Sequence, residues 1–283
     1  MTLAVASLGS GSRGNAFLVE AEGSRLLIDA GFSGAQMSRR LAQLDVDPAS
    51  IDLVVVTHEH RDHTSGIGVG ARRWGWTLAM NPATRRACAP LLKGAERSRD
   101  LPSRGLRVGA LEIEPVHTCH DAADPVAIVV HHSVSALSIG IATDLGRATV
   151  PVRQALKGCA FLVLEANHDE RMLRAGPYPW RVKQRIGGSR GHLSNRLAAE
   201  LARDLVHPGL EGILLAHLSA ECNDPAVAAD RVAEGLFPTR FDGTLACALQ
   251  DEPSERFDVG TRSRVRATHP QMSLFEAPAP KGA

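Results

Sequence analysis

The stretch THEHRDH at positions 57–63 contains four potential metal ligands: His58, His60, Asp62 and His63. In an extended chain residues i and i+2 point the same way, so His58 and His60 can share one ion. Asp62 and His63 follow a turn and can face a second ion. Imidazole and carboxylate ligands suit Zn²⁺, Mn²⁺ or Fe²⁺ better than Mg²⁺. The helical zinc motif H-E-x-x-H is absent, because position 62 is Asp.

Short apolar runs alternate with amphipathic stretches along most of the chain, which predicts a layered α/β protein. Glu22-Gly23 is expected to turn two of the strands into a hairpin. Several strands end in histidine or acid, as the 51–60 stretch does. The expected strands are 3–8, 16–21, 25–31, 51–60, 111–120, 126–132, 136–146, 160–169 and 212–219, and the expected helices are 34–44, 151–157, 169–186, 193–206 and 225–236.

The composition is that of an ordinary globular protein. The 283 residues are 44% hydrophobic and 22% charged, and the formal net charge is +1, so any nucleic-acid surface must come from segregated charge. The five cysteines form no C-x-x-C pair, which favours reduced thiols. There is no signal-like start and no apolar run long enough to span a membrane, so we expect a cytoplasmic protein. We expect one domain at 1–250 and a flexible tail at 251–283.

Several stretches together resemble the metallo-β-lactamase superfamily: H-x-H-x-D-H, LIDAG, CHDAADP, TDLG and LAHLS. The resemblance implies an αββα sandwich with two divalent metal ions, zinc or manganese, at one edge. It implies one site formed by His58, His60 and His120, a second formed by Asp62, His63 and His217, the shared ligand Asp144, and Asp29 as a carboxylate that orients the histidines. Asp62 would also act in catalysis. Two such cations about 3.5–4 Å apart make hydrolysis the expected chemistry.

His117 competes with His120 for the third position of the first site, since both lie in HTCH. The resemblance favours His120, because DAADP follows it as in the family pattern. The alternative role of His117 is to lie at the end of a strand.

Two features favour a phosphodiester substrate. GHLSN at 191–195 resembles the G-H-S-T motif of ribonuclease Z, which implies that His192 assists phosphate chemistry. The stretch from Arg171 to Gly191 contains six basic residues and no acid. In it we expect Trp180, Arg181, Lys183 and Arg185 to bind substrate. The alternative is a solvated helix face with Trp180 buried.

The fuller set of motifs, with SLGSGSRGN, EANHD and YPW added, is similar to the YycJ/WalJ group of metallo-β-lactamase-fold exonucleases, which act on DNA from the 5′ end. The glycine-rich loop SGSRGN is a candidate phosphate nest. EANHD is expected to bring Glu165 and His168 near the cavity, without an assigned role. An RNA-processing nuclease and a small-molecule ester or lactone hydrolase remain open as alternatives. A polyanion is favoured if residues 171–190 line the active-site groove, and a small molecule if they face away.

The tail contains QMSLF at 271–275, which resembles the bacterial sliding-clamp-binding peptide. The resemblance implies that Gln271 binds at the rim of the clamp pocket, while Met272, Leu274 and Phe275 supply apolar contacts. The alternative is that this segment docks on its own domain. The clamp interpretation predicts a protein of DNA replication or repair.

Overall fold

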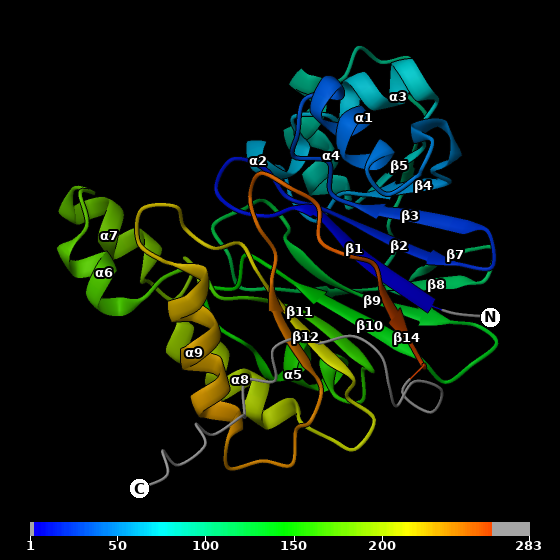
Figure 1. Cartoon of the computed structure of the whole chain (residues 1–283). Helices are drawn as coiled ribbons and strands as arrows, with labels where there is room; N and C mark the ends of the chain where they lie inside the picture. The colour runs from blue at the N-terminus through cyan, green and yellow to red at the C-terminus, as the bar shows by residue number, and fades with distance from the viewer. Residues whose placement is uncertain (1–2, 262–283) are drawn as a thin grey trace, which may run out of the picture.

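The structure is a computed structural model that describes residues 3–261. In this part of the chain two seven-stranded sheets lie face to face (Figure 1). The first sheet has the order β14 (Phe257–Val259), β1 (Leu3–Gly9), β2 (Ala16–Ala21), β3 (Ser24–Ile28), β4 (Leu53–Val55), β5 (Leu78–Met80) and β6 (Ser98–Asp100). The second has the order β13 (Thr244–Cys247), β12 (Gly212–Ala216), β11 (Phe161–Glu165), β10 (Ser138–Ala142), β9 (Val126–His132), β8 (Leu111–His117) and β7 (Leu106–Val108).

Helices cover the outer faces of both sheets, which gives four layers and confirms the predicted αββα sandwich (Figure 1). The first sheet is covered by α1 (Gly34–Ala42), α3 (Ile67–Trp74) and α4 (Pro82–Cys88), with the one-turn α2 (Arg61–Thr64) and the 3₁₀ turns η1 (Pro48–Ser50) and η2 (Ala89–Leu91) beside them. The second is covered by α5 (Val150–Leu156), α8 (Asn195–Leu205) and α9 (Pro225–Leu236). No helix among the described residues is long and apolar enough to cross a membrane.

Alternation along the strands divides the core into three apolar layers. In β2, Phe17 and Val19 point between the sheets, and Leu18 points toward the helices of the first sheet. In β12, Leu214 points between the sheets and Ile213 toward the helices of the second. Because both faces of these strands are buried, their sequences are continuous apolar runs.

Several predicted strands end earlier than the apolar pattern suggested. The expected strand 25–31 ends at Ile28, and the expected strand 136–146 ends at Ala142. Both are followed by an aspartate with a left-handed backbone, which takes the chain out of the sheet. The predicted hairpin is confirmed, with positive φ at Glu22 and Gly23 as a type I′ turn requires.

The predicted helix at 169–186 is wrong in one respect, because it is two helices: α6 (Glu170–Ala175) and α7 (Trp180–Ile186). The sequence Gly-Pro-Tyr-Pro separates them, since prolines 177 and 179 lack the amide hydrogens that a continuous helix needs. Residues 257–259, which the sequence assigned to the tail, form β14 and pair with β1. The QMSLF segment lies outside the described residues.

Candidate metal centre

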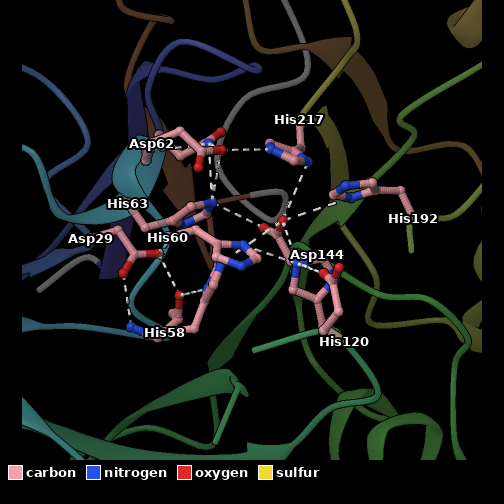
Figure 2. Close-up of polar contacts among 12 residues, drawn as sticks. Asp29, His58, His60, Asp62, His63, His120, Asp144, His192 and His217 are labelled. Carbon is pink, nitrogen blue, oxygen red and sulfur yellow. Dashed lines mark hydrogen bonds and ion pairs between the residues drawn. The ribbon is translucent and has the colours of Figure 1, made fainter. Parts of the chain in front are cut away.

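Histidine and carboxylate side chains gather where the strands of both sheets end (Figure 2). The first sheet supplies Asp29 after β3 and the run from His58 to His63 after β4. The second supplies His120 after β8, Asp144 after β10, Glu165 at the end of β11, His192 before α8 and His217 after β12. The site is therefore built at the seam between the two sheets.

Three of these residues have an unusual backbone. Asp29, Asp144 and His217 have φ angles of 62°, 57° and 56°. Left-handed non-glycine residues cost on the order of 1–3 kcal/mol each and are found where the surrounding structure enforces them. Here each of them leaves a strand within two residues of its end and turns a side chain into the cluster.

The first group consists of His58, His60 and His120, whose ligand atoms lie within 4.8 Å of one another. Thr57 Oγ1 donates its proton to Asp29, so it accepts a hydrogen bond from His58 Nδ1 at 3.0 Å. His58 Nε2 is then unprotonated, faces the cluster, and is buried without a hydrogen-bond partner.

His120 is held in the same way. Its Nδ1 donates to the Gly191 carbonyl at 2.9 Å, and its Nε2 lies 3.3 Å from His60 Nδ1. His117, the competing histidine, has a side chain that is 69% exposed and pairs with Asp124 instead. The geometry therefore favours His120 as the third member of the first group.

The second group consists of Asp62, His63 and His217. Asp62 Oδ2 lies 3.5 Å from His63 Nε2 and 3.2 Å from His217 Nε2. His63 Nδ1 donates to Asp29 at 2.7 Å, which orients its Nε2 toward the group. Asp29 thus contacts His63 directly and His58 through Thr57, in the orienting role that the resemblance implied.

Asp144 lies between the two groups. One carboxylate oxygen is 3.1 Å from His63 Nε2, and the other is 3.6 Å from His120 Nε2 and 4.0 Å from His58 Nε2. The side chain is buried. Asp144 is within reach of both groups, as a ligand shared by two ions must be.

Glu165 connects the remaining parts of the site. One oxygen accepts hydrogen bonds from His192 Nδ1 at 2.8 Å and His217 Nδ1 at 2.9 Å. The other accepts from the backbone amides of Leu145 at 2.8 Å and Leu193 at 2.9 Å. The sequence placed Glu165 near the cavity without a role. A lone carboxylate at the end of an otherwise apolar strand was the available signal.

Charges in the cluster compensate one another. Burial lowers the pKa of His217, but Asp144, Asp62 and Glu165 outweigh it and raise the pKa to about 10. Burial also lowers the pKa of His63, but Asp144, Asp29 and Asp62 outweigh burial and raise this pKa well above its usual value. Against the effect of burial, the neighbouring histidines hold the pKa of Asp144 well below its usual range. Protonated histidines thus neutralise the carboxylates of the cluster, and metal cations would compete with these protons for the same side chains.

These residues fit divalent cations. Imidazole and carboxylate are the ligands of zinc and related transition metals. The Nδ1 atoms of His58, His63 and His120 are occupied by protein acceptors, so the Nε2 atoms are left to face the centre. The buried, unpartnered His58 Nε2 is a position that a cation would satisfy.

The glycine-rich loop does not form the phosphate nest that the sequence suggested. Its amides at positions 10, 11, 13, 14 and 15 already donate to protein acceptors. Instead the loop supports the site. Ser10 Oγ accepts from the amide of His217, and Asn15 Nδ2 lies within hydrogen-bonding distance of Asp62 and His63.

The four predicted substrate-binding residues all lie on α7. Trp180 is 69% exposed, which contradicts the alternative in which it is buried. Among them Arg185 has a direct link to the centre, because it pairs with Asp121, whose other oxygen lies 3.3 Å from His120 Nε2. Trp180, Arg181 and Lys183 lie outside the cluster.

Comparisons with known proteins agree with this geometry. A model of the metallo-beta-lactamase superfamily matches residues 9–144. The exodeoxyribonuclease YycJ of Bacillus anthracis is 34% identical over 254 residues, which are 89% of this chain and 96% of that protein. The exodeoxyribonuclease WalJ of Streptococcus pneumoniae is 35% identical over 221 residues, 76% of this chain and 81% of that protein. The metallo-beta-lactamase fold protein YhfI of Bacillus subtilis shares the fold, with a TM-score of 0.69, 17% identity and coverage of 91% of this chain and 100% of that chain.

Proposed function

Because the chain belongs to the metallo-beta-lactamase superfamily and is a metal-dependent hydrolase, we propose that it is an exonuclease that degrades DNA from the 5′ end. The observation that carries this proposal is the similarity to two exodeoxyribonucleases over most of the chain. The fold by itself would be compatible with many hydrolytic substrates.

We assign one ion to His58, His60 and His120 and another to Asp62, His63 and His217, with Asp144 shared, and zinc or manganese as the metal. When bound, two such cations supply activated water at neutral pH and stabilise charge on the attacking and leaving oxygens of a phosphodiester. The Asp62 side chain is 23% exposed, and we assign it a second role in catalysis, as the resemblance implied.

His192 is the histidine of the cluster that belongs to neither group. Its ring lies beside those of His120 and His217, at centroid distances of 5.1 Å and 5.0 Å. Glu165 fixes its Nδ1 proton, which leaves Nε2 for the substrate. With a second proton on Nε2, the His192 imidazolium would donate a hydrogen bond to the phosphate or a proton to the leaving oxygen, and we assign it this role.

The proposal is tested by a time course on duplex DNA labelled at either the 5′ or the 3′ end, with Mn²⁺ and with Zn²⁺. We expect mononucleotides from the 5′ label and no such release by His60→Ala or Asp144→Ala. His131→Ala is the matched control, because His131 pairs with Glu114 at the surface and has no contact with the cluster.

Release from the 3′ label first would overturn the polarity, and cleavage of RNA alone would favour an RNA-processing enzyme. Turnover of a thioester or lactone, with no nucleic acid cleaved under either metal, would refute the nuclease and favour a small-molecule hydrolase.

We also propose that QMSLF tethers the enzyme to a sliding clamp during replication or repair. The support is the sequence alone: Gln271, Met272, Leu274 and Phe275 match the spacing of the clamp-binding peptide. A peptide of residues 267–280 should bind purified bacterial clamp, and the same peptide with Phe275→Ala should not. Equal binding of both peptides, or none at high micromolar concentration, would refute it.

A further inference from the structure

Helices α6 and α7 form a hairpin that stands apart from the helices covering the sheets (Figure 1). We call residues 169–191 the α6–α7 hairpin. Lys183 Nζ donates to the carbonyl of Arg174 at 2.6 Å and joins the two helices. Most of its side chains are exposed, and the buried Leu173 is an exception. The hairpin is therefore an external element whose surface residues are not needed to fill the core.

The two acids of the hairpin, Asp169 and Glu170, lie at its start, where Asp169 caps α6 and Glu170 pairs with Arg196. Between residues 171 and 190 there are six basic residues and no acidic one. Arg171, Arg174 and Arg181 are exposed, and none of them pairs with a carboxylate among the described residues. Unpaired, exposed cations of this density complement the charge of a phosphate backbone.

A surface groove of about 680 Å³ lies on the hairpin. It is lined by Leu173, Arg174, Trp180, Lys183, Gln184 and Gly187. A large aromatic side chain is normally buried, yet Trp180 is 69% exposed beside this groove. An exposed indole next to cations is the combination on which unpaired bases stack.

The hairpin is joined to the metal centre through the C-terminal end of α7. Arg185 Nε donates to Asp121 at 2.5 Å, and Asp121 lies beside His120. The amide of His192 donates to the carbonyl of Ile186 at 2.8 Å, so α7 leads directly into the loop that carries His192. At about 1.5 Å per residue, Trp180 lies roughly 10 Å along α7 from that junction.

We propose that the groove beside Trp180 binds an unpaired stretch of the nucleic-acid substrate. A base stacks on Trp180, and Arg174 and Lys183, which line the groove, contact the phosphates a short run of nucleotides from the bond that is cut. This inference rests on the proposed nuclease function. The occupant is single-stranded, because the bases of a duplex stack on one another and offer no free face to the indole.

The test uses the full-length, metal-loaded protein and its variants Trp180→Ala, Trp180→Phe and Arg174→Ala. The controls are Phe237→Ala and Arg39→Ala, because Phe237 is 76% exposed at the end of α9 and Arg39 is exposed on α1. The substrates are a 5′-phosphorylated oligothymidylate of about twelve nucleotides, the corresponding dinucleotide, and bis(p-nitrophenyl) phosphate. Binding of the labelled oligonucleotide is measured separately by fluorescence anisotropy in Ca²⁺.

We expect Trp180→Ala to raise KM for the longer oligonucleotide at least about fivefold with little change in kcat. Trp180→Phe should restore most of the affinity. Arg174→Ala should reduce the dependence of log K on log salt by about 0.7. Turnover of the dinucleotide and of bis(p-nitrophenyl) phosphate should be unchanged in all variants.

An unchanged KM in Trp180→Ala, or an equal loss on all three substrates, would overturn the inference. The two proposals can fail separately. If no nucleic acid is cleaved, anisotropy still reports whether Trp180→Ala weakens binding. If nucleic acid is cleaved and Trp180→Ala binds the oligonucleotide normally, the nuclease function is supported and the binding role of the groove is refuted.

Discussion

The substitution Glu165→Gln removes the negative charge of the buried carboxylate that connects the parts of the site, while the size and shape of the side chain are preserved. In the wild type both carboxylate oxygens accept two N–H groups each, from two histidines and two backbone amides. A glutamine has only one oxygen. Whichever way its amide is turned, the NH₂ group faces two donors and two hydrogen bonds are lost.

The loss of unfolding free energy in Glu165→Gln can be calculated in two ways. Hydrogen bonds to a charged group are worth roughly 1.5–3 kcal/mol each, so losing two costs about 3 kcal/mol or more. Burial raises the pKa of Glu165, but His192 and His217 lower it from 4.5 to about 2, which corresponds to on the order of 3 kcal/mol. The histidines also lose their orientation, so we expect activity to fall about 10–100-fold.

The assay is urea unfolding of the EDTA-treated proteins across a range of pH, with kcat measured in Mn²⁺. Because the folded pKa is depressed, the stabilisation by Glu165 is present above pH 4.5 and is lost as pH falls toward 2. The difference in unfolding free energy between wild type and variant should therefore shrink in that window. Glu200→Gln, which loses an exposed pair with Arg196, is the control and should cost less than about 1 kcal/mol. A Glu165→Gln protein within about 0.5 kcal/mol of wild type at neutral pH would refute the reasoning.

Three further results are expected. Chelation should abolish activity, and added Mn²⁺ or Zn²⁺ should restore it. Metal analysis should find fewer than two ions per chain in Asp144→Ala, and two ions per chain in that variant would contradict the role of Asp144 as a shared ligand. Gly31→Ala should lower the melting temperature by several degrees, because the new Cβ would lie 1.7 Å from the carbonyl oxygen of Asp62, and an unchanged melting curve would show that this approach is not rigid. The Cys88 thiol is fully buried and burial raises its pKa to about 12, so it should resist a thiol reagent at pH 8 that modifies the part-exposed Cys119, as mass spectrometry of the labelled peptides would show.

The parts of the site that could be predicted from sequence are those with local spacing. His58 and His60 alternate on an extended segment after an apolar strand, and His63 follows one helical turn later. Such patterns follow from the local geometry of strands and helices, which does not depend on the rest of the fold. The buried strands were equally visible, because β10, β11 and β12 are apolar on both faces.

Other features depend on contacts between distant segments. The role of Glu165 is set by His192 and His217, which lie 27 and 52 positions away along the chain. The strands β5, β6 and β7 have three residues each, too few to show a period, and all three residues of β6 are exposed. β14 has only three residues as well, and its pairing with β1 spans nearly the whole chain. The break between α6 and α7 was available from its two prolines.

The seam position of the site has a consequence for stability. His60 of the first sheet meets His120 of the second at 3.3 Å, and Asp62 meets His217 at 3.2 Å. Each proposed ion would therefore have ligands from both halves of the sandwich. Neither half contains all the ligands of either proposed ion, so these ions would favour the docked sheets over the separated ones.

A ligand that binds only the folded state stabilises it by about 2.7 kcal/mol at a concentration of 100 times Kd. The same ions that activate water would thus also hold the sheets together. The left-handed backbones of Asp29, Asp144 and His217 lower the stability of the metal-free protein, and metal binding would offset this cost. Metal loading should therefore stabilise a variant weakened between the sheets, such as Phe161→Leu, by the same free energy as wild type, because the two changes act on one docking equilibrium. A much smaller stabilisation of Phe161→Leu by metal would show that this substitution disturbs the metal centre at the seam as well as the packing between the sheets.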